Sequence, residues 1–122
     1  MPFSIDRIDH VVVNCRDLEA TAAWYERALG MKRQSFAGGR TALAFGRQKL
    51  NLRPTGAVDA PGSLDLCFIT TTQPDEVLRH LGSVGVAIVE GPVPKTGALG
   101  PMISVYCRDP DGNLVEIASY PA

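Results

Sequence analysis

The chain has 122 residues, the size of one ordinary domain, so separate cofactor and substrate domains are not expected. Its 12 Lys and Arg against 13 Asp and Glu give a net charge of −1, which removes the electrostatic case for binding nucleic acid or an anionic membrane surface. An apolar content of 45% is enough for a core, while 12 Gly and 9 Pro indicate many turns between short elements.

Targeting and cysteine patterns predict a cytoplasmic protein with reduced thiols. The first residues lack a basic segment followed by an apolar stretch, and no later apolar run is long enough to span a membrane. The three cysteines, Cys15, Cys67 and Cys107, form an odd set without a C-x-x-C pair, which argues against both a disulfide framework and a zinc ribbon.

The first half predicts one strand, one helix and three further strands. A β-branched strand precedes Asp17, a residue that suits a helix N-cap, and apolar residues then recur every three or four positions up to Gly30. Glycines separate the short strand-like segments that follow. The expected elements are a strand over 8–14, a helix over 18–29 and strands over 32–36, 41–45 and 48–53.

The second half repeats this order after a linker over 54–62. An offset of 55 places Asp17 on Thr72 and Gly30 on Gly85, and the offset grows to about 65 because of an extra loop over 91–101, expected to be a mobile cover. The chain is therefore expected to be a single α+β domain over 1–122, with βαβββ modules over about 4–54 and 63–120. The second set comprises a strand over 64–70, a helix over 74–84 and strands over 86–89, 102–108 and 114–120.

Alternation along the strands gathers polar residues on the face away from the helices. That face is expected to carry His10, Lys49, Asn51, Arg53, Asp65, Cys67 and Glu116. Three explanations stay open: a divalent cation bound by imidazole and carboxylates, a metal-free network in which Lys49 and Arg53 neutralise the acids, or a solvated face. In the first, His10, Asp65 and Glu116 are the ligands, with Asn51 as a fourth ligand or a partner of one.

Segments at both ends resemble a known family. Residues 8–12 (IDHVV), ahead of a helix containing residues 23–31 (AWYERALGM), are similar to the opening of a vicinal oxygen chelate module, and residues 106–117 (YCRDPDGNLVEI) resemble its closing strand. This superfamily includes glyoxalase I, fosfomycin resistance enzymes, extradiol dioxygenases and bleomycin-binding proteins. Residues 42–52, 61–67 and 90–98 carry a narrower resemblance to the glyoxalase-domain-containing protein 5 type and to bacterial virulence-associated relatives.

The resemblance implies a glyoxalase-like fold, in which two modules form a curved mixed sheet around a cleft. His10 matches the family's first-strand metal ligand and Glu116 its last-strand ligand. The other two positions depart from the pattern. Asp65 stands where many members have His, which weakens an extradiol dioxygenase reading, and Asn51 stands where glyoxalase I has Glu, which weakens a strict glyoxalase I reading.

The expected function is that of a metal-dependent lyase, isomerase or transferase of glyoxalase type. A divalent ion (Mn, Fe, Zn, Ni or Mg) on three protein ligands would keep positions open for a small substrate with two adjacent oxygens and would stabilise an oxyanion as a Lewis acid. Glu116 is the candidate catalytic residue, and Lys49, Asn51, Arg53 and Cys67 are candidate substrate contacts. The alternatives are an extradiol-type dioxygenase and a non-catalytic small-molecule binding protein. The resemblance also implies a homodimer.

Overall fold

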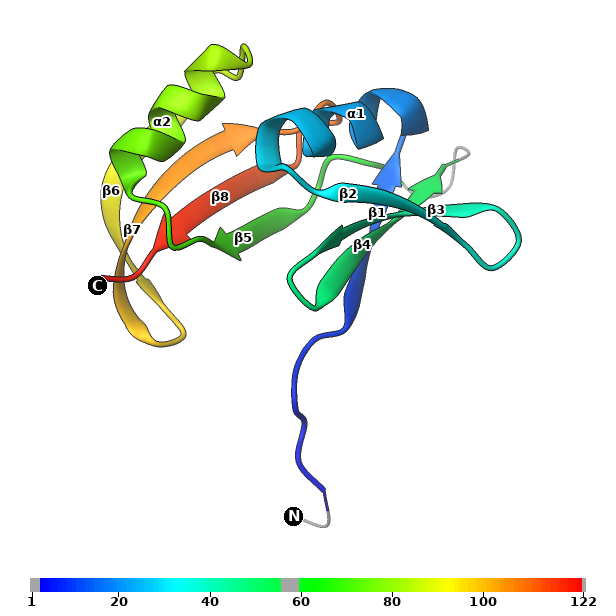
Figure 1. Ribbon diagram of the computed structural model, residues 1–122, viewed down its shortest axis with the longest axis horizontal. Coiled ribbons are helices and arrows are strands. Elements are labelled where there is room, and N and C mark those ends of the chain that lie inside the picture. The colour runs from blue at the N-terminus through cyan, green and yellow to red at the C-terminus, as the bar shows by residue number, and fades with distance from the viewer. Residues whose placement is uncertain (1–2, 56–59, 122) are drawn as a thin grey trace.

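Two βαβββ modules lie next to each other in the computed structural model, which describes residues 3–55 and 60–121 (Figure 1). Module 1 contains β1 (His10–Cys15), α1 (Leu18–Leu29), β2 (Lys32–Phe36), β3 (Arg40–Phe45) and β4 (Gln48–Pro54). Module 2 contains β5 (Asp65–Ile69), α2 (Pro74–Ser83), β6 (Glu90–Gly97), β7 (Gly100–Arg108) and β8 (Leu114–Ser119). The predicted α+β class and the tandem modules are confirmed. Positions 56–59 of the predicted linker lie outside the described residues.

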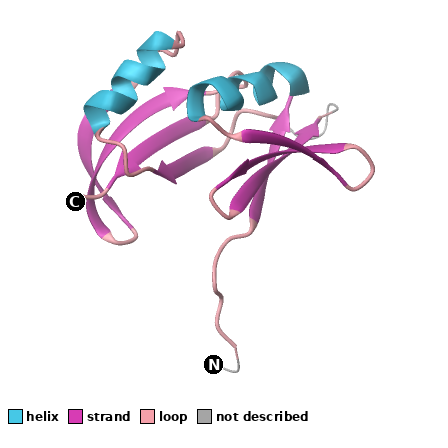
Figure 2. Ribbon diagram, viewed as in Figure 1, coloured by secondary structure: helices cyan, strands magenta, loops and turns pink. Residues whose placement is uncertain are grey.

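Each module forms its own four-stranded mixed sheet. Sheet A has the strand order β1-β4-β3-β2 and sheet B the equivalent order β5-β8-β7-β6. In both, the first and last strands of the module run parallel and the other neighbours are antiparallel. Both helices lie on one side of the molecule, above the sheets as drawn in Figure 2. Each sheet therefore has a helix-covered face and an open face.

The first helix begins and ends where the sequence predicts. Asp17 caps it, because its side chain accepts a hydrogen bond from the backbone N–H of Ala20 at 3.1 Å. Gly30 ends it with a φ of 66°, a left-handed conformation in which glycine is favoured, and its N–H bonds the Glu26 carbonyl. Buried Ala22, Tyr25 and Ala28 pack this helix into the core.

The second helix begins at the predicted Pro74 and ends at Ser83, one residue before the predicted boundary. Proline suits the first turn of a helix because its missing N–H has no partner there. Leu81, the helix residue with the least exposure, anchors α2 in the core against sheet B. Neither described helix is long and apolar enough to cross a membrane.

The predicted strand over 86–89 and the predicted cover over 91–101 are both wrong. Residues 86–89 lie outside any strand, β6 begins at Glu90 and pairs antiparallel with β7, and residues 98–99 form the turn that joins the two strands. Pro92 and Pro94 suggested a loop, yet β6 is an edge strand, where proline's missing N–H removes no ladder bond to a further neighbour. The turn between β6 and β7 is hydrogen-bonded to the residue that follows β8. The backbone N–H of Leu99 donates to the Tyr120 hydroxyl at 3.0 Å.

The turn between β7 and β8 of module 2 is hydrogen-bonded to helix α1 of module 1. The buried Tyr25 hydroxyl of α1 donates to Asp109 Oδ2 at 2.8 Å, and Thr21 Oγ1 donates to Asp111 Oδ2 at 3.1 Å. Asp109 also accepts from the side chain of Asn113 at 2.7 Å. Helix α1 thus packs on its own sheet and is hydrogen-bonded to module 2, which fixes the orientation of the two sheets.

Candidate functional site

The open face of sheet B carries the two predicted carboxylate ligands. Strand register places Glu116 of β8 between Cys67 of β5 and Tyr106 of β7, and Asp65 lies two residues before Cys67 on the same face. Glu116 is only 9% exposed because β8 lies inside the sheet. These four residues and Ser104 are called half-site B below.

The Glu116 carboxylate accepts a hydrogen bond from β7 and affects the pKa values of two neighbouring side chains. Ser104, which is fully buried on β7, donates from Oγ to Glu116 Oε2 at 2.6 Å. Burial, and then the hydrogen bond to Glu116, raises the pKa of Tyr106 to about 12. Burial, and then the negative charge of Glu116, raises the pKa of the Cys67 thiol to about 11. Both groups stay protonated at neutral pH, so Cys67 is a neutral lining residue and no activated nucleophile.

Ser104 and Tyr106 were not among the predicted site residues, although the sequence carries a signal for them. The turn after Arg108 sets the register in which Arg108 pairs with Leu114. Counting back in steps of two from Arg108 puts Tyr106 and Ser104 on the face of Glu116. Side-chain alternation within each strand alone does not show this, because the shared face depends on the register between β7 and β8 across this turn.

The open face of sheet A carries the remaining predicted residues. His10 pairs with Lys49 across β1 and β4, and its Nδ1 lies 2.9 Å from an oxygen of the exposed Asp9 carboxylate. Asn51, in the next row, is 4% exposed, and its Oδ1 has no hydrogen-bond partner among the described residues. Arg53 donates from Nε to Asn14 Oδ1 at 2.8 Å. His10, Lys49, Asn51 and Arg53 are called half-site A below.

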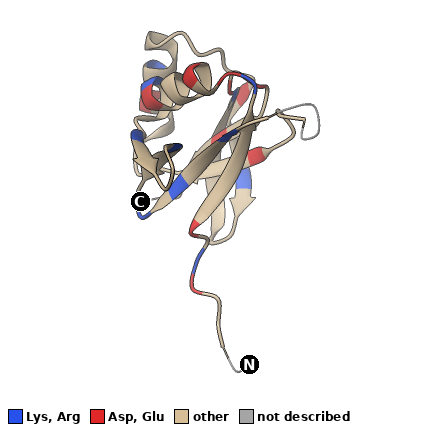
Figure 3. Cartoon of the chain, turned by 90° about the vertical axis from the view of Figure 1, so that its right-hand side faces the viewer, with Lys and Arg blue, Asp and Glu red and all other residues tan. Residues whose placement is uncertain are grey.

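The two open faces differ in charge. The open face of sheet A includes Lys32, Arg40, Lys49 and Arg53, and the sequences of its four strands contain no Asp or Glu. Figure 3 colours the basic and acidic residues of the molecule as seen from the right of Figure 1. The Lys49 ammonium lies 3.7 Å from the centre of the Phe36 ring, and Arg40 lies over the same ring at 4.7 Å. On sheet B, Glu90, Asp65 and Glu116 share the open face with Arg108 and Lys95.

One chain keeps the predicted metal ligands apart. Asp65 and Glu116 belong to half-site B and His10 to half-site A, and within residues 3–55 and 60–121 no three His, Cys, Asp or Glu side chains form a group that could hold a metal ion. The donor types themselves, one imidazole and two carboxylates, suit a hard divalent ion such as Mn²⁺ or Mg²⁺. Among the described residues of one chain, the imidazole and the two carboxylates therefore lie on different sheets.

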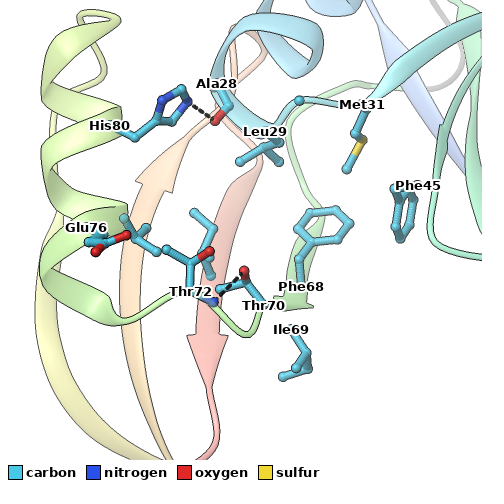
Figure 4. Close-up of a pocket in the computed structure, with 13 residues that line it drawn as sticks. Ala28, Leu29, Met31, Phe45, Phe68, Ile69, Thr70, Thr72, Glu76 and His80 are labelled. Atoms are coloured by element: carbon cyan, nitrogen blue, oxygen red, sulfur yellow. Dashed lines mark hydrogen bonds between the residues drawn. The ribbon is translucent and has the colours of Figure 1, made fainter.

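A cavity of about 450 Å³ lies at the junction of the modules, and no predicted site residue lines it (Figure 4). Phe45 and Phe68 meet edge to face on one side, with ring centres 5.3 Å apart. On the α2 side, His80 is exposed, and its Nε2 lies 2.9 Å from the carbonyl oxygen of Ala28 at the end of α1. The cavity is lined by residues of both helices and of β3, β5 and β8, and none of its lining residues belongs to either half-site.

Comparisons with known proteins agree with this architecture. Residues 7–117 match the family model described as the Glyoxalase/Bleomycin resistance protein/Dioxygenase superfamily. The chain is 47% identical over 123 residues to Virulence protein STM3117 of Salmonella typhimurium, covering 95% of this chain and 85% of that protein. It is 45% identical over 124 residues to Glyoxalase domain-containing protein RDO1 of Mycosarcoma maydis, covering 96% and 70%.

A solved structure shows the same fold over nearly the full length. The integron cassette protein VCH_CASS1 of V. cholerae superposes with a TM-score of 0.91 at 46% sequence identity, covering 98% of each chain. The resemblance seen in the sequence is thereby confirmed. The chain belongs to the Glyoxalase/Bleomycin resistance protein/Dioxygenase superfamily.

Proposed function

We propose that the protein is a divalent-metal-dependent enzyme of glyoxalase type, with a cleft formed between half-site A of one chain and half-site B of a second copy. One observation carries the proposal: the imidazole of His10 lies on the open face of sheet A, and the carboxylates of Asp65 and Glu116 lie on the open face of sheet B. A homodimer that faces sheet A of one copy toward sheet B of the other would complete two such clefts.

Charge and exposure support a second copy as the occupant of these faces. The cationic open face of sheet A is complementary to Asp65, Glu90 and Glu116 on sheet B. Val12 on the first face is 36% exposed and Ile69 on the second is 55% exposed. Residues 3–9 also extend away from the body, leaving Ile5 80% exposed (Figure 1). A partner surface would remove this apolar area from water.

The proposed ligands are His10 from one chain and Asp65 and Glu116 from the other. A divalent ion held there supplies a Lewis acid that stabilises an oxyanion on a small substrate with two adjacent oxygens. Glu116 is the proposed catalytic residue, since it would be one of the residues that hold the ion and its carboxylate could accept a proton from the substrate. Burial and the negative charge of Glu116 raise the pKa of Cys67, which would therefore contact the substrate as a neutral thiol without attacking it.

Half-site A would orient the substrate. Lys49 and Arg53 provide positive charge for an anionic group of the substrate. Asn51 Oδ1, which has no partner among the described residues, can accept a hydrogen bond from a substrate hydroxyl once a ligand opens its surroundings. The acids of half-site B and the cations of half-site A would thus bind opposite ends of the same small molecule.

A mixed-dimer experiment tests the shared cleft. His10→Ala and Glu116→Gln chains carrying different tags are coexpressed, and the mixed dimer is isolated by sequential affinity steps. In the mixed dimer one cleft carries both substitutions and the other carries neither. We expect about one Mn²⁺ per mixed dimer and none in either parent dimer, measured by electron paramagnetic resonance. Loss of binding in the mixed dimer would place all ligands within one chain.

Metal-free small-molecule binding is the second candidate function. It is favoured by the Glu116 carboxylate, which is buried and accepts a hydrogen bond from the buried Ser104 hydroxyl of the same sheet. If unchelated protein titrated with Mn²⁺, Fe²⁺, Zn²⁺ and Ni²⁺ binds none stoichiometrically, the enzyme proposal fails and this candidate replaces it. Oxygen uptake with catechols in the presence of Fe²⁺ would instead support an extradiol-type dioxygenase.

A further inference from the structure

The cavity at the junction of the modules, called the junction cavity below, has the size and lining of a small-molecule pocket. Its volume of about 450 Å³ falls within the range of roughly 300–1,000 Å³ that is usual for such pockets. The edge-to-face pair of Phe45 and Phe68 lines it together with residues of both helices (Figure 4). Most of the lining is apolar and includes Leu29, Met31, Val77 and Ile117. None of the lining residues belongs to half-site A or B, so the proposed function leaves the junction cavity without a role.

The α2 side of the junction cavity is negatively charged. Among the lining residues, Glu76 is the one Asp, Glu, Lys or Arg. Its carboxylate makes no hydrogen bond or ion pair with another residue that the structure describes. Asp75 precedes it, so the first turn of α2 carries two carboxylates, which exceed the partial positive charge of about half a unit at that end of a helix. This side of the cavity therefore favours a cation.

The end of α1 adds to the negative potential. Ala28, Leu29 and Gly30 line the junction cavity, and the last carbonyl groups of a helix carry partial negative charge. Arg27, the basic residue of that turn, is not among the lining residues. His80 Nε2 lies 2.9 Å from the Ala28 carbonyl oxygen, and because that oxygen only accepts, Nε2 carries the proton. In the neutral ring Nδ1 is then left as a further acceptor, one helical turn from the Glu76 carboxylate.

We propose that the junction cavity binds an organic amine, in which a protonated amino group is carried on an aromatic body. The ammonium would lie between Glu76 and the end of α1, where its three N–H groups meet acceptors and no cation. The aromatic body would pack on Phe45 and Phe68, since a third ring can add to an edge-to-face pair. An anionic ligand of the same shape would meet like charge instead. This site would be separate from the cleft of the proposed function and would need no metal ion.

Nuclear magnetic resonance titration of the full chain tests the site and the charge of its ligand. The protein is labelled with ¹⁵N, its backbone amides are assigned, and the probe is tryptamine. The matched anionic probe is indole-3-propionate, which has the same ring system. We expect tryptamine to shift the amides of Leu29, Met31, Phe68 and Val77, with a Kd on the order of 1 mM for a ligand of its size. Indole-3-propionate should bind roughly 5-fold more weakly or worse, because it exchanges an ion pair for repulsion.

Glu76→Gln tests the proposed counter-ion, and Asp75→Asn is its matched control. Asp75→Asn removes the same charge from the same turn of α2, at a residue that does not line the junction cavity. Both side chains are exposed, so neither substitution should disturb folding. We expect Glu76→Gln to weaken tryptamine binding roughly 2- to 5-fold, the range of an exposed ion pair, and Asp75→Asn to weaken it less than about 2-fold.

The possible results separate the inference from its rivals. An absence of tryptamine shifts around the junction cavity, or equal affinity for the two probes, would overturn it. Equal weakening by Glu76→Gln and Asp75→Asn would also overturn it, because it would indicate a general attraction between the cation and the acidic helix. Shifts confined to half-sites A and B would move the amine to the proposed cleft and contradict the inference. Failure of the protein to bind Mn²⁺ would overturn the proposed function alone, since this titration contains no metal ion.

Discussion

Cys107 carries a fully buried thiol on β7, and burial raises its pKa to about 11. The folded chain therefore keeps this proton at pH values where the unfolded chain, with a pKa near 9, has lost it. Because the folded state binds more protons, the free energy of unfolding should fall as pH rises from about 9 to about 11. Burial also raises the pKa of Tyr25, which extends the decline to still higher pH.

Urea unfolding at several pH values between 8 and 11 measures this decline. In Cys107→Ala, the slope of the free energy of unfolding against pH should be shallower by up to about 1.4 kcal/mol per pH unit, the effect of one proton. The contributions of Cys15 and Tyr25 should remain. An unchanged slope in Cys107→Ala would show that the thiol titrates normally in the folded chain.

Asn51 is a second residue whose replacement gives a clear prediction. Its Oδ1 is buried and has no hydrogen-bond partner among the described residues, and an unpaired buried acceptor costs about 1–3 kcal/mol. Leucine has a similar shape and no polar atom. Asn51→Leu should therefore raise the free energy of unfolding by about 1 kcal/mol in chemical denaturation. A lower stability would mean that Oδ1 has a partner, such as a bound water.

The predicted site residues illustrate what alternation along a strand can establish. It correctly placed His10 with Lys49 on sheet A, and Cys67 with Glu116 on sheet B, because side chains on a strand alternate strictly. It could not identify Ser104 as a neighbour of Glu116, because that neighbourhood depends on the pairing between β7 and β8. Nor could it predict that Asn51 would be buried, since exposure depends on the side chains that cover a face.

At the scale of the element, β6 shows how closely two strands approach. A Cβ added to Gly91 would lie 2.5 Å from the Ser104 carbonyl oxygen and 3.0 Å from Val105 Cα, and the φ of Gly91 is 113°. Gly100 has a similar positive φ of 116° with nothing within 4 Å of the added atom. Gly91→Ala combines backbone strain with a steric clash, whereas Gly100→Ala has the strain alone.

Thermal unfolding of the two glycine variants separates these effects. Gly100→Ala should cost about 1–3 kcal/mol, and Gly91→Ala should cost at least about 2 kcal/mol more because the main chain of β7 must move. The two results together measure the close approach of β6 to β7. Equal losses would indicate that the hairpin shifts freely and that β6 is only loosely paired.

Elements with local signals were predicted well, and β6 was not. The N-cap Asp17 and the stop at Gly30 mark both ends of α1 within the sequence itself. The two prolines of β6 favour a loop by the same local rules. They fit a strand only because β6 lies at the edge of sheet B, and the order of strands in a sheet is a property of the whole module.

At the scale of the whole molecule, the predicted residues separate into two half-sites. The duplication was visible in the sequence as repeated caps, stops and strands. Periodicity assigns each residue to a face of its own sheet, but it carries no information on how two sheets are oriented. That orientation depends on contacts between distant segments, such as the hydrogen bond between Tyr25 and Asp109.

The hydrogen bond between Tyr25 and Asp109 should make the two modules unfold as one unit. Trp24, the only tryptophan, lies on α1 and reports on module 1, whereas circular dichroism reports on both modules. Coincident transitions by the two probes are expected for wild type. Tyr25→Phe leaves the buried Asp109 carboxylate with one donor fewer and should lower the free energy of unfolding by about 1–3 kcal/mol.

Tyr120→Phe provides the matched control. Its hydroxyl accepts a hydrogen bond from Leu99 at the exposed hairpin tip, so its loss should cost about 0.5 kcal/mol or less. Combining Tyr25→Phe with Asp111→Ala also removes the bond to Thr21 and should separate the fluorescence and circular dichroism transitions. If the transitions of the double variant stay coincident, the apolar contacts of α1 with module 2 hold the modules together without these hydrogen bonds, and the sheet orientation has a different cause.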